Sequence, residues 1–129
     1  MWIAQYAKRT GLSVSTVRYY VRIGLVFPEQ SAAGATNRYM RFSERDVEQA
    51  ARIRIGQTLG MSLTEIKSLI DARRSGAKGD EPLLRTLVAQ KRRLEQRVQE
   101  LTALTDFIDA KIRWMRNGKT GAIPELSAK

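Results

Sequence analysis

The feature that most constrains the fold of this chain is a long segment, residues 81–116, in which apolar side chains recur at alternating intervals of three and four residues. This spacing is that of the a and d positions of a coiled coil, sustained over several heptads. Lys91 and Thr105 occupy the polar positions of this seam. The apolar positions are Leu84, Leu87, Leu94, Val98, Leu101, Ile108, Ile112 and Met115. At 1.5 Å per residue the helix would span roughly 54 Å, which is longer than a small globular core can cover, so it needs a partner helix.

The expected partner is a second copy of the chain, because the rest of the sequence contains no other helix of comparable length. An antiparallel pairing about a two-fold axis near Val98 and Leu101 places Leu84 opposite Met115. A regular heptad repeat permits several such registers, so this pattern is compatible with an antiparallel dimer without requiring it. The alternative is that the helix folds back on its own chain.

Two short helices separated by a glycine are predicted over residues 2–22. Ser13 is placed to cap the second helix, and Val14, Val17 and Val21 give it an inward-facing stripe. Its outward side chains are then Ser15, Thr16, Arg18, Tyr19 and, as one of two alternatives, Tyr20. This arrangement predicts a helix-turn-helix whose second helix enters a DNA groove. Lys8 and Arg9 end the first helix, where cations suit the dipole and can reach phosphate.

A wing and two further helices are expected to complete this region. After an extended segment at Phe27-Pro28, residues 29–37 are typical of a hairpin tip, and residues 38–42 alternate as a strand does. Capping-box signals at Ser43 and Ser62 each predict a helix, the first over about 44–59. The predicted buried faces of these helices are Val47, Ala51, Ile55 and Leu59 in the first, and Leu63, Ile66, Leu69 and Ile70 in the second. Trp2 is expected to pack on the first helix of the chain, and Arg52 and Arg54 to face solvent.

The predicted fold is therefore mainly α: a winged helix-turn-helix domain followed by a long dimerisation helix. Its expected divisions are residues 1–72 for the winged domain, 73–80 for a linker, 81–116 for the coiled-coil helix and 117–129 for a short tail.

Composition supports a polyanion-binding role and argues against catalysis. The chain has 23 basic and 13 acidic residues, a net charge of +10 that favours nucleic acid or an anionic membrane surface, although a surplus for solubility is the simpler alternative. It has neither cysteine nor histidine, which excludes disulfides, thiolate metal sites and imidazole catalysis. Neither a signal-peptide pattern nor a membrane-length apolar run is present. We therefore expect a cytoplasmic protein that is not an enzyme, holds no cofactor or metal and does not associate with a membrane.

Several stretches of the sequence resemble the MerR family of bacterial transcription regulators. They are Ile3–Ser13, Val17–Leu25, Arg41–Val47 and Leu59–Ile66. The resemblance implies a dimer, joined by an antiparallel coiled coil, that binds a pseudo-palindromic promoter site in double-stranded DNA. Such a dimer would control transcription by RNA polymerase by distorting the promoter spacer.

The resemblance also implies roles for individual residues. Ser15, Thr16, Arg18 and Tyr19 would enter the major groove. The residues that would hold phosphate are Tyr20, Tyr39 and Arg41, with Lys8 and Arg9 as additional backbone contacts. The wing departs from the family pattern, which has glycine and arginine where this chain has Arg38 and Met40. Arg38 and Arg41 keep the positive charge of the wing, and both are expected to contact DNA.

Sensing and output are left with alternatives. The absence of cysteine excludes thiol-based detection of metals or oxidants. Phe107, Trp114 and Met115 could line a small apolar pocket for an unknown effector, or simply pack in the dimer. The protein could also be a constitutive repressor or an architectural DNA-binding protein without an effector, or a coiled-coil adaptor.

Overall fold

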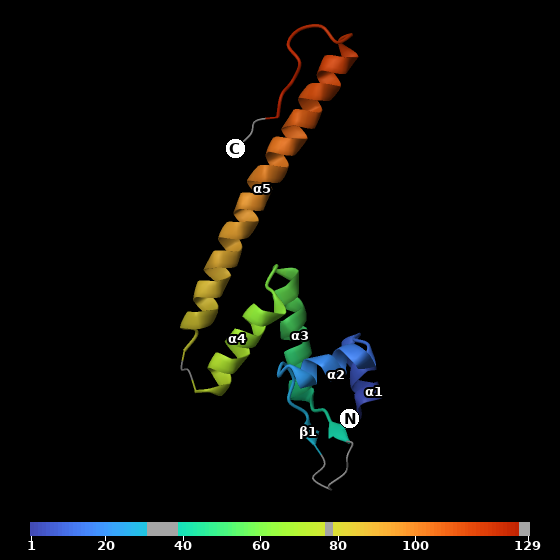
Figure 1. Cartoon of the computed structure of the whole chain (residues 1–129), viewed down its shortest axis with the longest axis vertical. Coiled ribbons are helices and arrows are strands. Elements are labelled where there is room, and N and C mark those ends of the chain that lie inside the picture. Colours follow the sequence, from blue (N-terminus) through green and yellow to red (C-terminus); the bar gives the residue numbers. More distant parts are fainter. Residues whose placement is uncertain (31–38, 77–78, 127–129) are drawn as a thin grey trace. The chain divides into compact units, whose positions relative to one another are not determined.

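The computed structural model of the chain describes residues 1–30, 39–76 and 79–126. It divides into two units, Met1–Leu83 and Leu84–Lys129 (Figure 1). The first unit contains four helices and a two-stranded sheet among its described residues, and the second consists of most of one long helix and the segment after it.

The first unit begins with the two short helices that the sequence predicts. They are α1 (Ile3–Thr10) and α2 (Val14–Arg22). Between them Gly11 has φ 74°, a left-handed conformation that glycine adopts without strain, and its N–H donates to the Ala7 carbonyl. Ser13 caps α2 as predicted, because its Oγ accepts from the Thr16 N–H at 3.1 Å. The two helices therefore form a helix-turn-helix with a locally determined turn.

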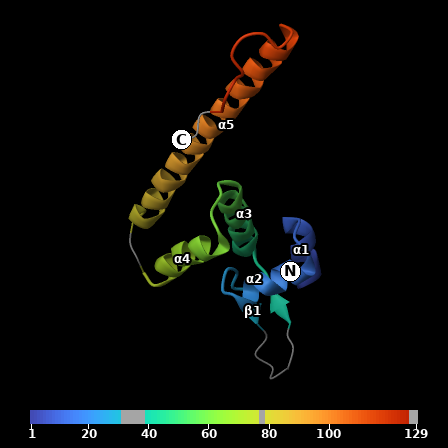
Figure 2. The same ribbon diagram turned by 45° about the horizontal axis from the view of Figure 1, so that its top comes forward.

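The wing is a short antiparallel ladder of β1 (Glu29–Gln30) and β2 (Met40–Arg41), in which Glu29 is opposite Arg41. The first strand thus lies in the segment that the sequence assigned to the hairpin tip. The rest of that tip, and Arg38, lie outside the described residues. Beyond the ladder, the Phe42 N–H donates to the Met1 carbonyl at 2.7 Å, and the Met1 nitrogen donates back to Phe42 at 2.8 Å. These two bonds join the start of the chain to the wing, whose β2 arrow lies beside it in Figures 1 and 2.

Two capped helices, α3 (Glu44–Thr58) and α4 (Leu63–Arg74), complete the first unit. Both predicted capping boxes form, Ser43 with Asp46 and Ser62 with Glu65, so that each side chain satisfies a backbone N–H of the other residue. The helix α4 extends further than expected and includes Arg73 and Arg74, which the sequence placed in the linker. The Arg74 guanidinium lies 3.6 Å from the centre of the Phe27 ring, and this stacking holds the last turn of α4.

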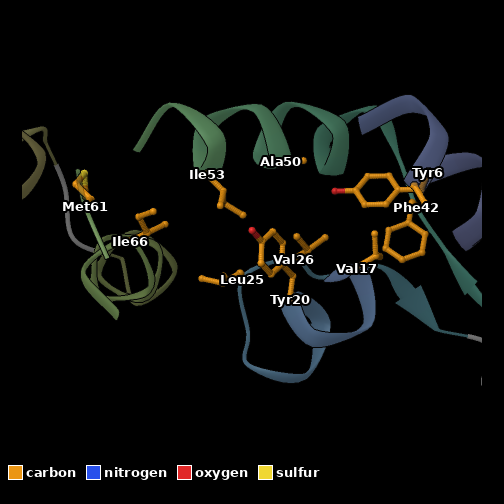
Figure 3. Close-up of a cluster of buried hydrophobic side chains, with 11 residues drawn as sticks. Tyr6, Val17, Tyr20, Leu25, Val26, Phe42, Ala50, Ile53, Met61 and Ile66 are labelled. Atoms are coloured by element: carbon orange, nitrogen blue, oxygen red, sulfur yellow. The ribbon is translucent and has the colours of Figure 1, made fainter. Parts of the chain in front are cut away.

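One hydrophobic core joins these elements (Figure 3). The side chains of Tyr6, Val17, Leu25, Val26 and Ile53 are fully buried in it. The Tyr6 ring stacks on Phe42, with 4.2 Å between ring centres, and its hydroxyl donates to the Asp46 carbonyl at 2.6 Å. Burial raises the pKa of the Tyr6 phenol well above its ordinary value, so this hydroxyl remains a donor. The Tyr6 contacts connect α1, the wing and α3.

The buried face of α3 matches the sequence prediction only in part, because Val47 packs against the core and Leu59 is half-buried but the other two predicted residues are exposed. Ile55 is 60% exposed and Ala51 is exposed, whereas the face that packs inward carries Asp46, Ala50, Ile53 and Gly56. Successive steps of four residues advance about 40° around a helix, so such a row leaves the packed side after two turns. The observed row uses steps of four and three and stays on one side. Gly56 allows close contact with α4, because a Cβ there would be 3.0 Å from Ile66 Cδ1.

The long helix α5 (Glu81–Arg116) has the bounds that the heptad pattern predicted. After it, the described tail turns back alongside the last turns of the helix, as Figures 1 and 2 show. The Lys119 N–H donates to the Trp114 carbonyl at 3.0 Å, and Trp114 Nε1 donates to the Gly121 carbonyl at 3.4 Å. Neither α5 nor any other helix in the described ranges is long and apolar enough to cross a membrane.

Candidate nucleic-acid interface

The outward face of α2 carries the side chains that the sequence assigned to the major groove. Ser15, Arg18 and Tyr19 are exposed, whereas Thr16 is half-buried. The Ser13 hydroxyl donates to Thr16 Oγ1 at 2.8 Å and lies 3.2 Å from Ser15 Oγ. The hydroxyls at the start of α2 therefore form one small network around the helix cap. Arg18 is the exposed cation of this face that lies nearest to the cap.

Tyr19 has a cationic neighbour, Arg22, that the sequence pattern did not indicate as a site residue. The Arg22 guanidinium lies 5.2 Å from the centre of the Tyr19 ring, which is 41% exposed. The two residues are three positions apart on one helix face, a spacing that could have indicated the contact. The pair presents a positive charge next to an aromatic face, a combination suited to a DNA backbone.

Tyr20 belongs to the core. Its ring is 6% exposed and lies among the core side chains in Figure 3, and its hydroxyl is 3.5 Å from Gln57 Oε1. Of the two alternatives for this residue, the structure supports packing. A phosphate contact by Tyr20 is therefore restricted to its hydroxyl, and it stays a prediction.

Arg9 is held by an acidic partner, whereas Lys8 is exposed. Arg9 Nη1 and Nη2 each donate to a Glu44 carboxylate oxygen at 2.9 Å, which joins the end of α1 to the start of α3. The hydrogen bond from Arg9 lowers the pKa of the Glu44 carboxyl, and the same bond raises the pKa of Arg9. Both side chains remain largely exposed. A phosphate contact by Arg9 would have to compete with Glu44.

A second arginine, Arg54, is exposed as the sequence predicted, but it also makes a hydrogen bond that the sequence did not indicate. Its Nη2 donates to the Thr10 carbonyl at 2.7 Å, and the same guanidinium lies against Gly11. It thereby satisfies a carbonyl at the end of α1 and supports the turn before α2. A partner 44 residues away leaves no local pattern in the sequence.

The wing presents an exposed aromatic and cationic cluster. Tyr39 is 63% exposed and Arg41 is exposed, as a phosphate-binding role requires. Trp2, which the sequence placed against the first helix, contacts the wing and is 53% exposed. It caps α1 with extended backbone geometry, and its ring lies 5.9 Å from the Tyr39 ring and 5.5 Å from the Arg41 guanidinium. Because Trp2 precedes the helix, its side chain is not constrained to the helix face and turns to the wing.

The seam of α5 is open to solvent along its length in the single chain. The exposed fraction of its apolar side chains ranges from 41% at Leu87 and Ile112 to 63% at Val98. The other exposed members are Leu84, Leu94, Leu101, Ile108 and Met115. A continuous apolar row of this kind is typical of a helix whose partner is another chain.

The residues considered for an effector pocket do not share one environment. Phe107 and Trp114 are half-buried, and Lys111 Nζ lies 5.7 Å from the Trp114 ring centre. Met115, in contrast, is 53% exposed on the seam. Within the described ranges, the structure contains no group of three histidine, cysteine or carboxylate side chains that could hold a metal ion. The pocket stays a prediction.

A helix-turn-helix with a wing, an exposed basic recognition helix and a long heptad helix defines a DNA-binding regulator. Residues 1–73 match the family model described as MerR HTH family regulatory protein, and residues 47–111 match the model described as MerR, DNA binding. The chain belongs to the MerR family. It is a MerR-type transcriptional regulator that binds DNA.

Known relatives agree with this assignment. The chain is 34% identical to the HTH-type transcriptional regulator YfmP of Bacillus subtilis, covering 92% of this chain and 85% of the relative. Among solved structures it is similar to the transcription regulator PbrR691 of Ralstonia metallidurans, in complex with lead(II), with a TM-score of 0.68 at 25% identity, over 88% of this chain and 86% of that one. Its fold is also similar to that of HiNmlR, a MerR family regulator lacking the sensor domain, bound to promoter DNA. That comparison gives a TM-score of 0.67 at 24% identity, over 92% and 91% of the two chains.

Proposed function

We propose that two copies of this chain pair through the α5 seam and bind one pseudo-palindromic promoter site, and that the dimer controls transcription by distorting the spacer between promoter elements. The observation that carries the proposal is the exposed apolar row on α5, together with one exposed recognition helix in each chain. Each chain carries both the seam that would pair the two copies and a helix that would read DNA. The proposal therefore predicts that DNA binding depends on dimerisation.

The seam supplies the driving force for pairing. Fully burying a leucine- or isoleucine-sized side chain contributes about 1.5–3 kcal/mol, and eight such positions are exposed in each chain. The cost of association, about 4–15 kcal/mol, is smaller than the sum that such a row can supply. Lys91 is exposed, so its ammonium can extend past a seam to solvent while its methylenes pack. An antiparallel pair about Val98 and Leu101 satisfies all of these positions.

The winged helix-turn-helix domain of each subunit is called a head below. Each head would present the outer face of α2 to the major groove and the wing to the adjacent backbone. Arg18 is positioned to donate to a base edge or a phosphate, and Ser15, Thr16 and Tyr19 surround it. Two heads related by a two-fold axis match a site whose halves are inverted repeats. Lys8, Arg38 and Arg41 would add backbone contacts.

Control of transcription would follow from the shape of the bound DNA. Bending a site of 20–30 base pairs by 40–90° costs about 1–6 kcal/mol, an amount that two phosphate-binding heads can supply. RNA polymerase would then meet promoter elements in an altered relative orientation. Activity on the promoter requires no catalytic chemistry by this chain, so we propose that it is not an enzyme and that it acts in the cytoplasm, where promoter DNA is.

One observation limits the signals to which the protein can respond. Because the sequence has no cysteine, it offers no thiolate for soft-metal binding or oxidation. A constitutive repressor or an architectural protein would share the DNA site and the dimer, but transcription would not depend on any added compound.

The decisive experiment combines footprinting with a chemical probe of DNA shape. DNase I protection upstream of the gene should reveal an inverted repeat, and permanganate should detect unpaired or unstacked thymines in the spacer when the protein is bound. Protection of a site without symmetry would contradict the two-headed arrangement. Symmetric protection with unaltered spacer reactivity would contradict the distortion mechanism and favour simple repression.

A further inference from the structure

We infer that Trp2 is an additional DNA-contacting residue, and that Trp2, Tyr39 and Arg41 form one surface that packs on the sugar-phosphate backbone beside the recognition helix. The inference rests on the DNA-binding function given above and assigns a role to a residue that neither the sequence analysis nor the family match identified. The three residues are called the wing cluster below.

Trp2 is 53% exposed and Tyr39 63% exposed, although large aromatic side chains usually gain by burial. The two rings lie 5.9 Å apart at an interplanar angle of 65°. An exposed aromatic pair of this kind is typical of a contact surface rather than of a core.

The backbone of Trp2 is fixed on one side by α1, where its carbonyl accepts from the Tyr6 N–H at 3.0 Å. On the other side, the neighbouring Met1 makes the two bonds to Phe42 that join the start of the chain to the wing. Phe42 is itself buried and stacked on Tyr6. The backbone at Trp2 is therefore fixed by bonds within the protein, and the wing cluster does not need DNA to hold it in place.

Although Glu29 is opposite Arg41 in the ladder, the Arg41 guanidinium lies over the Trp2 ring, 5.5 Å from its centre. A guanidinium held against an indole keeps its charge and its outer N–H groups for an anion, while the ring beside it offers an apolar contact for deoxyribose. A cation next to aromatic faces is the chemistry that recognises a nucleic-acid backbone.

The experiment uses the full chain carrying Trp114→Phe, which leaves Trp2 as the single tryptophan. A fluorescein-labelled duplex of mixed sequence at low salt serves as the probe, because a backbone contact does not require the specific site. Anisotropy of the label reports binding, while Trp2 emission and its quenching by acrylamide report contact. We expect Trp2 emission to change in a saturable manner at the same protein concentration as the anisotropy, and acrylamide quenching to fall.

A second arm measures affinity. Trp2→Ala is expected to weaken duplex binding by about five- to thirtyfold in a dimer with two heads, and Trp2→Phe by less, because one aromatic ring remains. Trp114→Phe is the matched control and should bind as the unmodified protein does. Circular dichroism melting of each variant separates loss of contact from loss of folding.

The outcomes are distinguishable. Duplex binding with unchanged Trp2 emission and unchanged acrylamide quenching would overturn the wing-cluster role and leave the DNA-binding function intact. A Trp2→Ala variant that melts earlier but binds with unchanged affinity when folded would likewise reduce Trp2 to a structural residue. Failure of any duplex to bind the single-tryptophan protein would contradict the DNA-binding function itself, and the inference with it.

Discussion

Arg9 and Glu44 are joined by two hydrogen bonds of 2.9 Å, so a basic residue expected to bind phosphate is already paired within its own chain. The pair connects the end of α1 to the start of α3 and lies on an exposed surface. It could serve as a positioning contact, or it could restrain a cation that is released when phosphate arrives.

Replacement of the acid separates these two roles. Glu44→Gln removes a negative charge and weakens the hold on Arg9, so the duplex affinity is expected to increase about two- to fivefold at low salt. The slope of log affinity against log salt should become steeper by about one ion per head if Arg9 then binds phosphate. Fluorescence anisotropy over a salt series measures both quantities. A fall in affinity would show instead that the pair positions the helix-turn-helix for binding.

The same pair predicts a pH dependence. Arg9 lowers the pKa of the Glu44 carboxyl, so its stabilising contribution is present above the unfolded-state pKa and is lost as the pH falls through the lowered value. The thermal midpoint of the unmodified protein should therefore fall slightly more than that of Glu44→Gln between neutral pH and the acid range. The difference is expected to be small, because both groups are exposed to solvent. Identical pH profiles for the two proteins would contradict this contribution.

Arg18 is expected to discriminate between sequences. Arg18→Ala should cost about 1–3 kcal/mol of specific binding if the guanidinium reads a base, with little change in the salt slope. If it holds only phosphate, specific and non-specific affinity should fall together and the slope should decrease by about one. Arg52→Ala on α3, an exposed arginine with the same charge, is the matched control. Unchanged binding by Arg18→Ala would show that the recognition helix is oriented differently.

Charges placed on the seam should produce monomers. Leu94→Glu with Leu101→Glu puts carboxylates at the centre of the proposed interface, where burial without a partner is costly. Sedimentation velocity should then show a single subunit, and operator binding should be lost. Gln96→Glu with Ala103→Glu adds two acids to the opposite face of α5 and should remain dimeric. A dimer in the first variant would exclude the seam as the interface.

Gly56 is predicted to be a packing requirement between α3 and α4. A Cβ at this position would lie 3.0 Å from Ile66 Cδ1 and 3.1 Å from its Cγ1. Gly56→Ala should therefore lower the free energy of unfolding by about 1–2 kcal/mol, because overpacking exceeds the helix-propensity gain of about 1 kcal/mol. Urea denaturation measures this loss. Ile66→Val removes the contacting methyl group and should restore part of it, and strictly additive effects in the double variant would contradict the proposed contact.

Much of the fold could be predicted because its signals are local. The caps at Ser13, Ser43 and Ser62 depend on groups three residues away, and each forms as expected. The bounds of α5 follow from the heptad pattern, which lies entirely within that segment of the sequence. In the wing, the exposure of Tyr39 and Arg41 and the burial of Phe42 follow from strand alternation.

The surface that meets DNA was less predictable, because its side chains are held by residues distant in the sequence. Arg9 bonds to Glu44 across 35 positions, Arg54 to Thr10 across 44, and the Tyr20 hydroxyl lies near Gln57, 37 positions away. The Trp2 ring likewise contacts Tyr39 of the wing, 37 positions away.

The sequence by itself therefore determined the helices, their caps and the apolar seam, since each depends on hydrogen bonds or periodicity within a few residues. Only the tertiary structure decided which face of α3 is buried, that Tyr20 is a core residue, and which arginines are already engaged. Those outcomes depend on how the elements pack against one another, and the residue pattern of one helix does not show which element it packs against.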